Sequence, residues 1–256
     1  AGAEEPTWVL LAWAAGSLIA ILLLPHGQTR CPRLEWHPEA YRAAAFLLWV
    51  DLATVVYFRV DVLLLDAMGV SAAEIGQYAA AYRIIEALIL VTAPASLLVF
   101  RALRLERQAL ARLRTRLIRA LVIAVIAGAL AVGVLTALAE ELIDIAFGPS
   151  YRESARLLDV LAWALFFILP NAILTQAAIA LNRERVYAVI ATTAAILNIA
   201  LNAWMIPHHG AMGAAWATVA TEAWLFVLLA IGTVRWCRGD GHSRPGQAGF
   251  GIKCPD

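Results

Sequence analysis

Long apolar runs alternate with short polar segments along the chain, and this pattern predicts membrane-spanning helices. Most of the runs reach the ~20 residues that an α-helix needs to cross the hydrocarbon layer of a bilayer. About seven spans are predicted, at residues 8–24, 43–66, 75–100, 117–138, 156–180, 186–206 and 212–234. The pattern therefore predicts an all-α, polytopic membrane helix bundle.

The same pattern divides the chain into three parts. Residues 1–40 hold one transmembrane helix and a loop, and residues 41–235 hold a lobe of six helices. Residues 236–256 are Gly-rich and polar, a composition typical of a disordered tail.

The basic residues between the spans predict a topology. If odd-numbered spans run inward, the inner segments hold sixteen Lys or Arg residues, whereas the outer segments hold only Arg152 and Arg156. This asymmetry fits the positive-inside rule, with the N-terminus outside and the C-terminus in the cytoplasm. Seven arginines fall within residues 101–119. They could contact nucleic-acid phosphates, but the segment lies between two spans and lacks interleaved aromatics. A topogenic segment facing anionic membrane lipids is expected instead, with no nucleic-acid partner.

Composition supports a membrane protein. The apolar fraction is 62% and the mean hydropathy is +0.75, against roughly 45–50% apolar residues in soluble domains. The three cysteines lack metal-ligand spacing, so no metal site is expected. The sequence has no nucleotide-binding signature and no nucleophile with a nearby base. It predicts neither an enzyme nor a primary pump, and no cofactor.

Several predicted spans carry ionisable side chains, although a charge at the bilayer centre costs ~2.5–3.5 kcal/mol on insertion scales. These residues are Asp51, Arg59, Asp61, Arg83, Glu86 and Glu222. Two interpretations stay open. The charges could form ion pairs that fix helix packing. Alternatively, they line a polar path, where Arg59 and Arg83 meet an anionic substrate and the carboxylates carry protons or cations.

Uncharged polar residues also fall within the predicted spans. Asn198 and Asn202 lie one helical turn apart, and Thr218 shares a helix face with Glu222. We expect the amides and hydroxyls to form hydrogen bonds between helices. Glu222 has no basic neighbour in the sequence, so it lies near an aqueous end or is protonated.

Small residues and a proline predict local geometry. Gly128 and Gly133 allow close helix contact in the span at 117–138. Pro170 removes a backbone donor and predicts a kink in the span at 156–180.

Three stretches follow one another along the chain: YFRVDVLLLDAMGVSAAEIGQYAAAYRIIEAL, IAFGPSYRESARLLDVLAWAL and LNIALNAWMIPHHGAMGAAWATVATEAWLF. In this order they resemble the polysaccharide flippases of the multidrug/oligosaccharidyl-lipid/polysaccharide exporter superfamily. The resemblance covers residues 41–235. It implies the six-helix C-terminal lobe of a twelve-helix, MATE-like transporter, with the span at 8–24 matching the helix before that lobe.

The resemblance also implies a function. Such a transporter would flip an undecaprenyl-diphosphate-linked oligosaccharide across the inner (cytoplasmic) membrane by alternating access, in the biosynthesis of cell-surface polysaccharide such as lipopolysaccharide. Arg59, and with it Arg83, falls on helices that would meet the diphosphate or acidic sugars. Because two lobes form the cavity, an N-terminal lobe or a second copy of this chain is an expected partner.

Two alternatives remain at the level of the sequence. The carboxylates Asp51, Asp61, Glu86 and Glu222 could couple a cation gradient to export of a small molecule or drug. The chain could instead be a non-transporting scaffold of a glycan-assembly complex.

Overall fold

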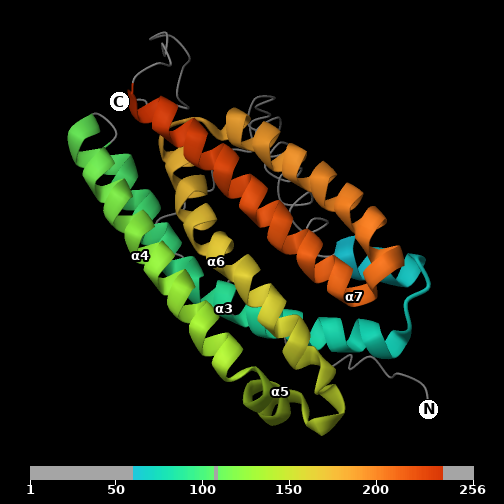
Figure 1. Cartoon of the computed structure of the whole chain (residues 1–256). Coiled ribbons are helices and arrows are strands. Elements are labelled where there is room, and N and C mark those ends of the chain that lie inside the picture. Colours follow the sequence, from blue (N-terminus) through green and yellow to red (C-terminus); the bar gives the residue numbers. More distant parts are fainter. Residues whose placement is uncertain (1–59, 107–108, 239–256) are drawn as a thin grey trace, which may run out of the picture. The chain divides into compact units, whose positions relative to one another are not determined.

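The computed structural model describes residues 60–106 and 109–238. The chain divides into two compact units, Ala1–Trp49 and Val50–Asp256, and every described residue belongs to the second. All regular elements of the described residues are helical (Figure 1). After helical residues 60–67 come α3 (Ala72–Leu105), α4 (Leu110–Ala137), α5 (Ala139–Phe147), the 3-10 turn η1 (Pro149–Tyr151), α6 (Glu153–Ala180) and α7 (Glu184–Arg238).

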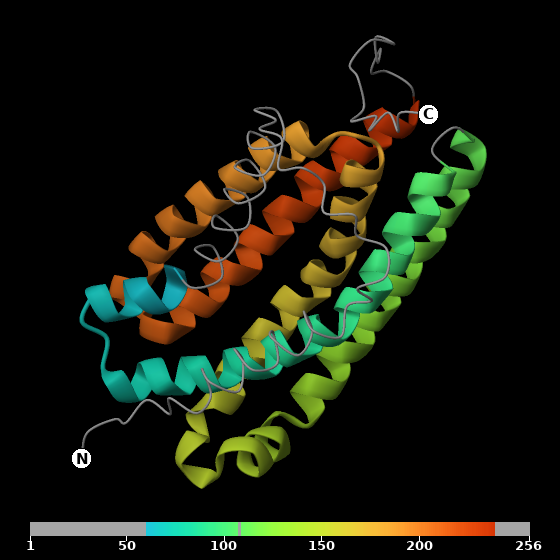
Figure 2. The same ribbon diagram turned by 180° about the vertical axis from the view of Figure 1, so that it is seen from behind.

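Helix α6 is the centre of this unit. It packs against α3, α4 and α7, and Figure 2 shows it between these helices from the opposite side. Its buried residues, among them Leu158, Leu161 and Leu165, occur all around the helix rather than on one stripe. A helix that is apolar on every side is either buried in a protein core or spans a membrane, and the neighbours of α6 bury it.

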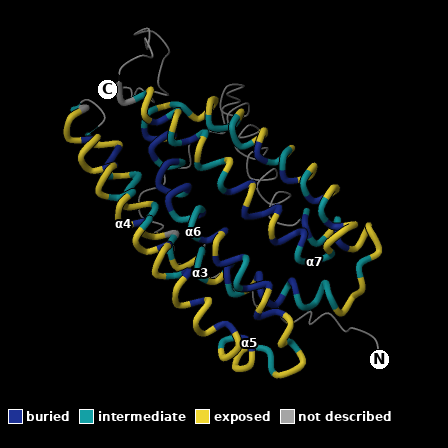
Figure 3. The backbone as a smooth tube through the Cα atoms, in the orientation of Figure 1, coloured by how far each residue is buried: buried dark blue, intermediate teal, exposed yellow. Residues whose placement is uncertain are grey.

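Among the described residues, four helices are long and apolar enough to cross a membrane: Ala72–Leu105, Ala111–Ala137, Glu153–Ala180 and Glu184–Trp236. The all-α prediction and the presence of membrane-length helices are confirmed for the described residues. The outer faces of α3 and α4 are exposed in Figure 3, and they carry large apolar side chains such as Leu90, Ile123 and Leu130. The count of about seven spans stays a prediction, because the span at 8–24 and most of 43–66 lie outside the described residues.

Helix α7 is a hairpin of two arms. The backbone of Gly210 is not helical (φ 54°, ψ −137°), and the chain reverses direction there. The two arms, orange and red in Figure 1, run side by side, and the Asn198 amide reaches Thr221 Oγ1 across them (3.4 Å). The predicted spans at 186–206 and 212–234 correspond to these arms. The second arm continues to Arg238, two residues past the start of the predicted tail at 236.

A tight turn joins residues 60–67 to α3. Gly69 has φ 76°, and the N–H of Val70 donates to the carbonyl of Leu65 (3.1 Å), which closes the helix end. Ser71 then caps α3 by accepting from the N–H of Glu74 (3.2 Å). This short connection places the helix at 60–67 beside the first turns of α3.

Small residues set the spacing between α4 and α6. A Cβ atom at Gly128 would lie 3.1 Å from the Cα of Phe166, so the prediction of close contact is confirmed at this glycine. At Gly133 nothing lies within 4 Å of such an atom, and the prediction is wrong there. Pro170 does not end α6, which runs through it to Ala180.

Candidate functional site

The carboxylate of Asp61 lies at the meeting point of three helical segments. The hydroxyls of Tyr78 and Thr218 donate to Oδ2 (2.9 and 3.0 Å). The amide of Asn202 donates to Oδ1 (2.9 Å). Tyr78 comes from α3, whereas Asn202 and Thr218 come from the two arms of α7. Asp61 is only 2% exposed, so these donors replace the water that a carboxylate would otherwise bind.

All three donors are uncharged. Arg116–Glu106 and Arg156–Glu153 are ion pairs elsewhere in the structure, and Asp61 forms none with another described residue. A buried carboxylate is costly unless opposite charge and hydrogen bonds compensate it. Among the described residues, hydrogen bonds from neutral groups compensate the cost of burying the Asp61 carboxylate.

The hydrogen bonds continue from Asp61 along the first arm of α7. The amide nitrogen of Asn202 also lies 3.0 Å from both the backbone oxygen and Oδ1 of Asn198. Asn198 in turn donates to Thr221 on the second arm. Asn202 Oδ1 is buried and has no hydrogen-bond partner in the described part of the chain. Among these residues it is an unused acceptor on the same side chain that binds the carboxylate.

A second carboxylate lies one residue beyond Thr221. Glu222 is 3% exposed, and the amide of Asn171 on α6 donates to its Oε2 (2.8 Å) and to its backbone oxygen (3.0 Å). Asn171 Oδ1 is buried and unpartnered, as Asn202 Oδ1 is. Each buried carboxylate is thus bound by an asparagine whose own carbonyl oxygen lacks a donor.

We call this set of buried groups the polar track. Its members are Asp61, Tyr78, Asn171, Asn198, Asn202, Thr218, Thr221 and Glu222. It follows the facing sides of the α7 arms and reaches α3 and α6.

The geometry at Asp61 accommodates a proton without leaving a broken hydrogen bond. Thr218 Oγ1 lies 3.0 Å from Asp61 Oδ2 and 3.0 Å from the carbonyl of Ala214, yet it has one hydrogen to donate. A protonated Asp61 could donate to Thr218, whose hydrogen then turns to Ala214. A small hard cation would also find carboxylate, amide and hydroxyl oxygens here. The site is therefore suited to bind and release a positive charge.

The remaining predicted site residues lie either on α3, outside the polar track, or outside the described residues. Arg83 is exposed on α3 and Glu86 is half-buried, and neither is part of the polar track. Tyr78 and Tyr82 of the same helix are buried and stacked, with ring centroids 5.7 Å apart. Asp51 and Arg59 lie outside the described residues. The roles assigned to these residues stay predictions.

The sequence indicated both carboxylates of the polar track but not their partners. Asn198, Asn202 and Thr218 were expected to form hydrogen bonds between helices, and Asn171 directly follows Pro170, where the sequence predicts a kink. The available signal was the helical spacing of small polar residues on otherwise apolar helices, such as Asn198 and Asn202 one turn apart.

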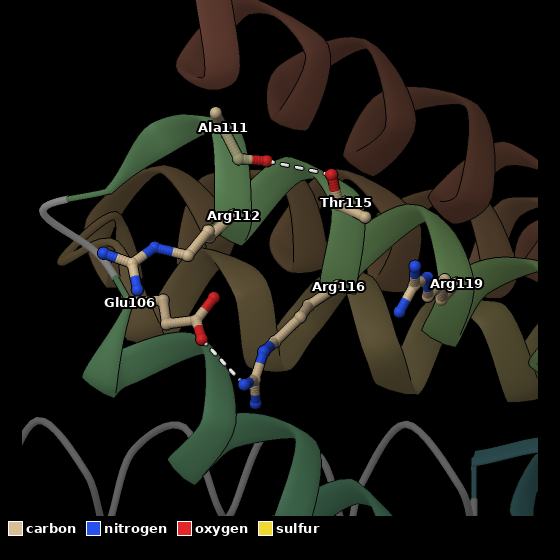
Figure 4. Close-up of a pocket in the computed structure, with 6 residues that line it drawn as sticks. All are labelled: Glu106, Ala111, Arg112, Thr115, Arg116 and Arg119. Atoms are coloured by element: carbon tan, nitrogen blue, oxygen red, sulfur yellow. Dashed lines mark hydrogen bonds and ion pairs between the residues drawn. The ribbon is translucent and has the colours of Figure 1, made fainter.

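The arginine-rich segment forms a shallow basic pocket where α3 meets α4 (Figure 4). Arg112, Arg116 and Arg119 line it from α4, and Glu106 lies between Arg112 and Arg116. Arg116 pairs with Glu106 (2.7 Å). Because the Arg116 side chain is 54% exposed, this pair contributes little to stability.

The fold and the polar track together indicate an α-helical membrane protein with carboxylates buried between its helices. Comparison of the chain with protein-family models, with curated proteins and with solved structures finds no match in any of the three. The flippase resemblance therefore stays a prediction.

Proposed function

We propose that this chain is one lobe of a membrane transporter that flips undecaprenyl-diphosphate-linked oligosaccharide for cell-surface polysaccharide synthesis. The cargo and the inner-membrane location follow from the resemblance of three ordered stretches to polysaccharide flippases. The membrane-length helices are compatible with it. The polar track is the proposed element that couples cargo movement to a proton or cation gradient.

One observation carries the coupling role: the groups that bind Asp61 are neutral throughout the described residues. A structural ion pair would hold this carboxylate permanently charged, and apolar packing would stabilise the helices at least as well as a buried charge. A carboxylate held by hydroxyl and amide donors can instead gain and lose a positive charge. Since its donors come from α3 and both arms of α7, the charge on Asp61 changes how firmly these segments are joined.

The second lobe completes the proposed cavity. Arg83 is exposed on α3 rather than buried in the polar track. Such a position fits contact with cargo or with a second lobe, which another chain or a second copy would supply. Arg59 and Arg83 are the proposed contacts to the diphosphate.

Flipping in proteoliposomes tests the coupling role. The protein carrying this chain would be reconstituted with a fluorescent polyprenyl-diphosphate oligosaccharide, under an imposed proton or sodium gradient. We expect Asp61→Asn to abolish the gradient-dependent rate. Asp66→Asn, an exposed carboxylate on the same helix, serves as the matched control and should keep it. A wild-type gradient response in Asp61→Asn would refute the coupling role.

A cation-coupled small-molecule exporter is the second candidate, and the polar track favours it equally. The two proposed functions differ in the cargo that is transported. Gradient-driven efflux of a cationic dye, without flipping of the oligosaccharide lipid, would replace the first proposal by the second.

A further inference from the structure

A crevice lies between α4, α6 and the second arm of α7, and no member of the polar track lines it. Its volume is about 330 Å³, at the lower end of the range for ligand pockets, roughly 300–1,000 Å³. Its walls are mainly apolar, and they include Leu121 and Val125 of α4, Leu174 of α6 and Phe226 of α7.

Two polar groups of the crevice wall lie at one end of the bundle. Arg114 is in the second turn of α4, and Thr233 is near the end of α7. These two helix ends lie together in Figures 1 and 2. Val125 follows Arg114 by eleven residues, which is about 16 Å along a helix. The crevice is thus polar at the helix ends and apolar further along.

Thr233 is the observation that points to a ligand. The residue is 4% exposed, and its Oγ1 is buried with no hydrogen-bond partner among the described residues. A hydroxyl in a helix commonly donates to the carbonyl one turn earlier, and Thr221 does so in this same arm. Leaving a buried hydroxyl unpaired is unfavourable. An acceptor arriving in the crevice would pair with it.

We infer that the crevice binds an anionic phospholipid of the surrounding membrane. Arg114 is exposed, and it forms no ion pair with any described residue. Its guanidinium and the Thr233 hydroxyl are donors for the phosphate, and one acyl chain lies along the apolar wall. Every phospholipid brings a phosphate that can accept from Thr233, so the hydroxyl holds the headgroup without selecting it. Arg114 supplies the preference for net negative charge, because it repels the cationic headgroup of a zwitterionic lipid. This inference does not depend on the transport proposal.

Lipid titration of the purified full chain in detergent, followed by native mass spectrometry, tests the inference. The probes are phosphatidylglycerol and phosphatidylcholine with identical chains. We expect the first to bind about tenfold more tightly, because only the second brings a choline cation close to the Arg114 guanidinium. Arg114→Gln should remove this preference. Arg112→Gln, the same change on the same helix but outside the crevice, should keep it.

Two further variants separate binding from folding. Thr233→Val keeps the shape of the side chain, so it should weaken phosphatidylglycerol binding while raising the thermal stability of the lipid-free protein. Ala230→Phe fills the crevice and should weaken both lipids. Equal affinity for the two lipids, or equal loss in Arg112→Gln and Arg114→Gln, would overturn the inference. Tighter binding of undecaprenyl phosphate than of phosphatidylglycerol would also overturn the inference, if Arg114→Gln removes that binding.

Discussion

Asp61 and Asn202 are 141 residues apart in the chain, yet the amide of Asn202 donates to the carboxylate of Asp61 over 2.9 Å. This bond joins the helix at 60–67 to the first arm of α7. Thr218 joins the same carboxylate to the second arm. One side chain therefore connects the first described helix to both halves of the hairpin.

Removing the Asn202 amide should destabilise the protein through Asp61. In Asn202→Leu the buried carboxylate loses one of its three donors, so we expect the free energy of unfolding to fall by about 1–3 kcal/mol. Thermal unfolding in detergent measures the loss. Thr192→Val, an exposed residue of the same arm whose hydroxyl bonds only to Ala188 of its own helix, should change stability little.

A double-mutant cycle shows whether the loss acts through the carboxylate. Adding Asp61→Asn removes the charge that the amide stabilises, so Asn202→Leu should cost less in that background. We expect a coupling energy of about 0.5–3 kcal/mol. Additive losses would mean that Asn202 acts through packing or through Asn198 instead.

Neutralising Glu222 should leave the protein as stable as the wild type, or more stable by about 1 kcal/mol. In Glu222→Gln the new amide can donate to Asn171 Oδ1, which is unpartnered in the wild type. It can still accept from the Asn171 amide. Asn171→Leu should have the opposite effect, because Glu222 stays buried and loses a donor. Chemical or thermal unfolding of the two variants gives the comparison, and a marked loss in Glu222→Gln would contradict it.

Hydropathy predicted the helices because an apolar run long enough to cross a bilayer has few stable conformations other than a membrane-spanning helix. The arms of α7 matched two separate predicted spans, since the His208–Gly210 segment interrupts the apolar run. Asp61 and Glu222, the two carboxylates of the polar track, were also found from sequence. A carboxylate within an apolar helix is costly to bury in lipid or in protein, so its presence there is informative.

The partners of those carboxylates could not be predicted in the same way. A threonine in a helix can bond to its own backbone, to a neighbouring helix or to both. Thr193 bonds to the carbonyl of Ile190, whereas Thr218 also reaches Asp61. The difference lies in which helix face meets another helix, and this depends on tertiary packing. Gly128 and Gly133 differ for the same reason.

The contrast between these glycines gives a third prediction. Gly128→Leu would push a side chain against the backbone of Phe166, and overpacking of this kind typically costs about 1–3 kcal/mol. Gly133→Leu faces open space and should be tolerated. The midpoints of thermal unfolding in detergent, measured under identical conditions, test the pair. Equal destabilisation by both variants would show that α4 and α6 do not meet at Gly128 as described.

Glu74 should stabilise the reversal of α7. Its Oε1 accepts a hydrogen bond from the backbone N–H of Ala211 (2.7 Å), directly after the non-helical Gly210. This is the role of an N-cap side chain, supplied here by another helix, so Glu74→Ala should lower the free energy of unfolding by about 0.5–2 kcal/mol. Glu141→Ala, an exposed glutamate in the first turn of α5, is the control and should have little effect.

Proteolysis locates the effect of that cap. Loss of the cap frees the start of the second arm, so Glu74→Ala should raise the rate of limited cleavage around His208–Gly210 relative to the control. Gly210→Ala should raise it further, since φ 54° is unfavourable for a residue with a Cβ atom and that atom would collide with Glu74. Wild-type cleavage in both variants would mean that the arms of α7 hold the reversal by their own packing, without Glu74.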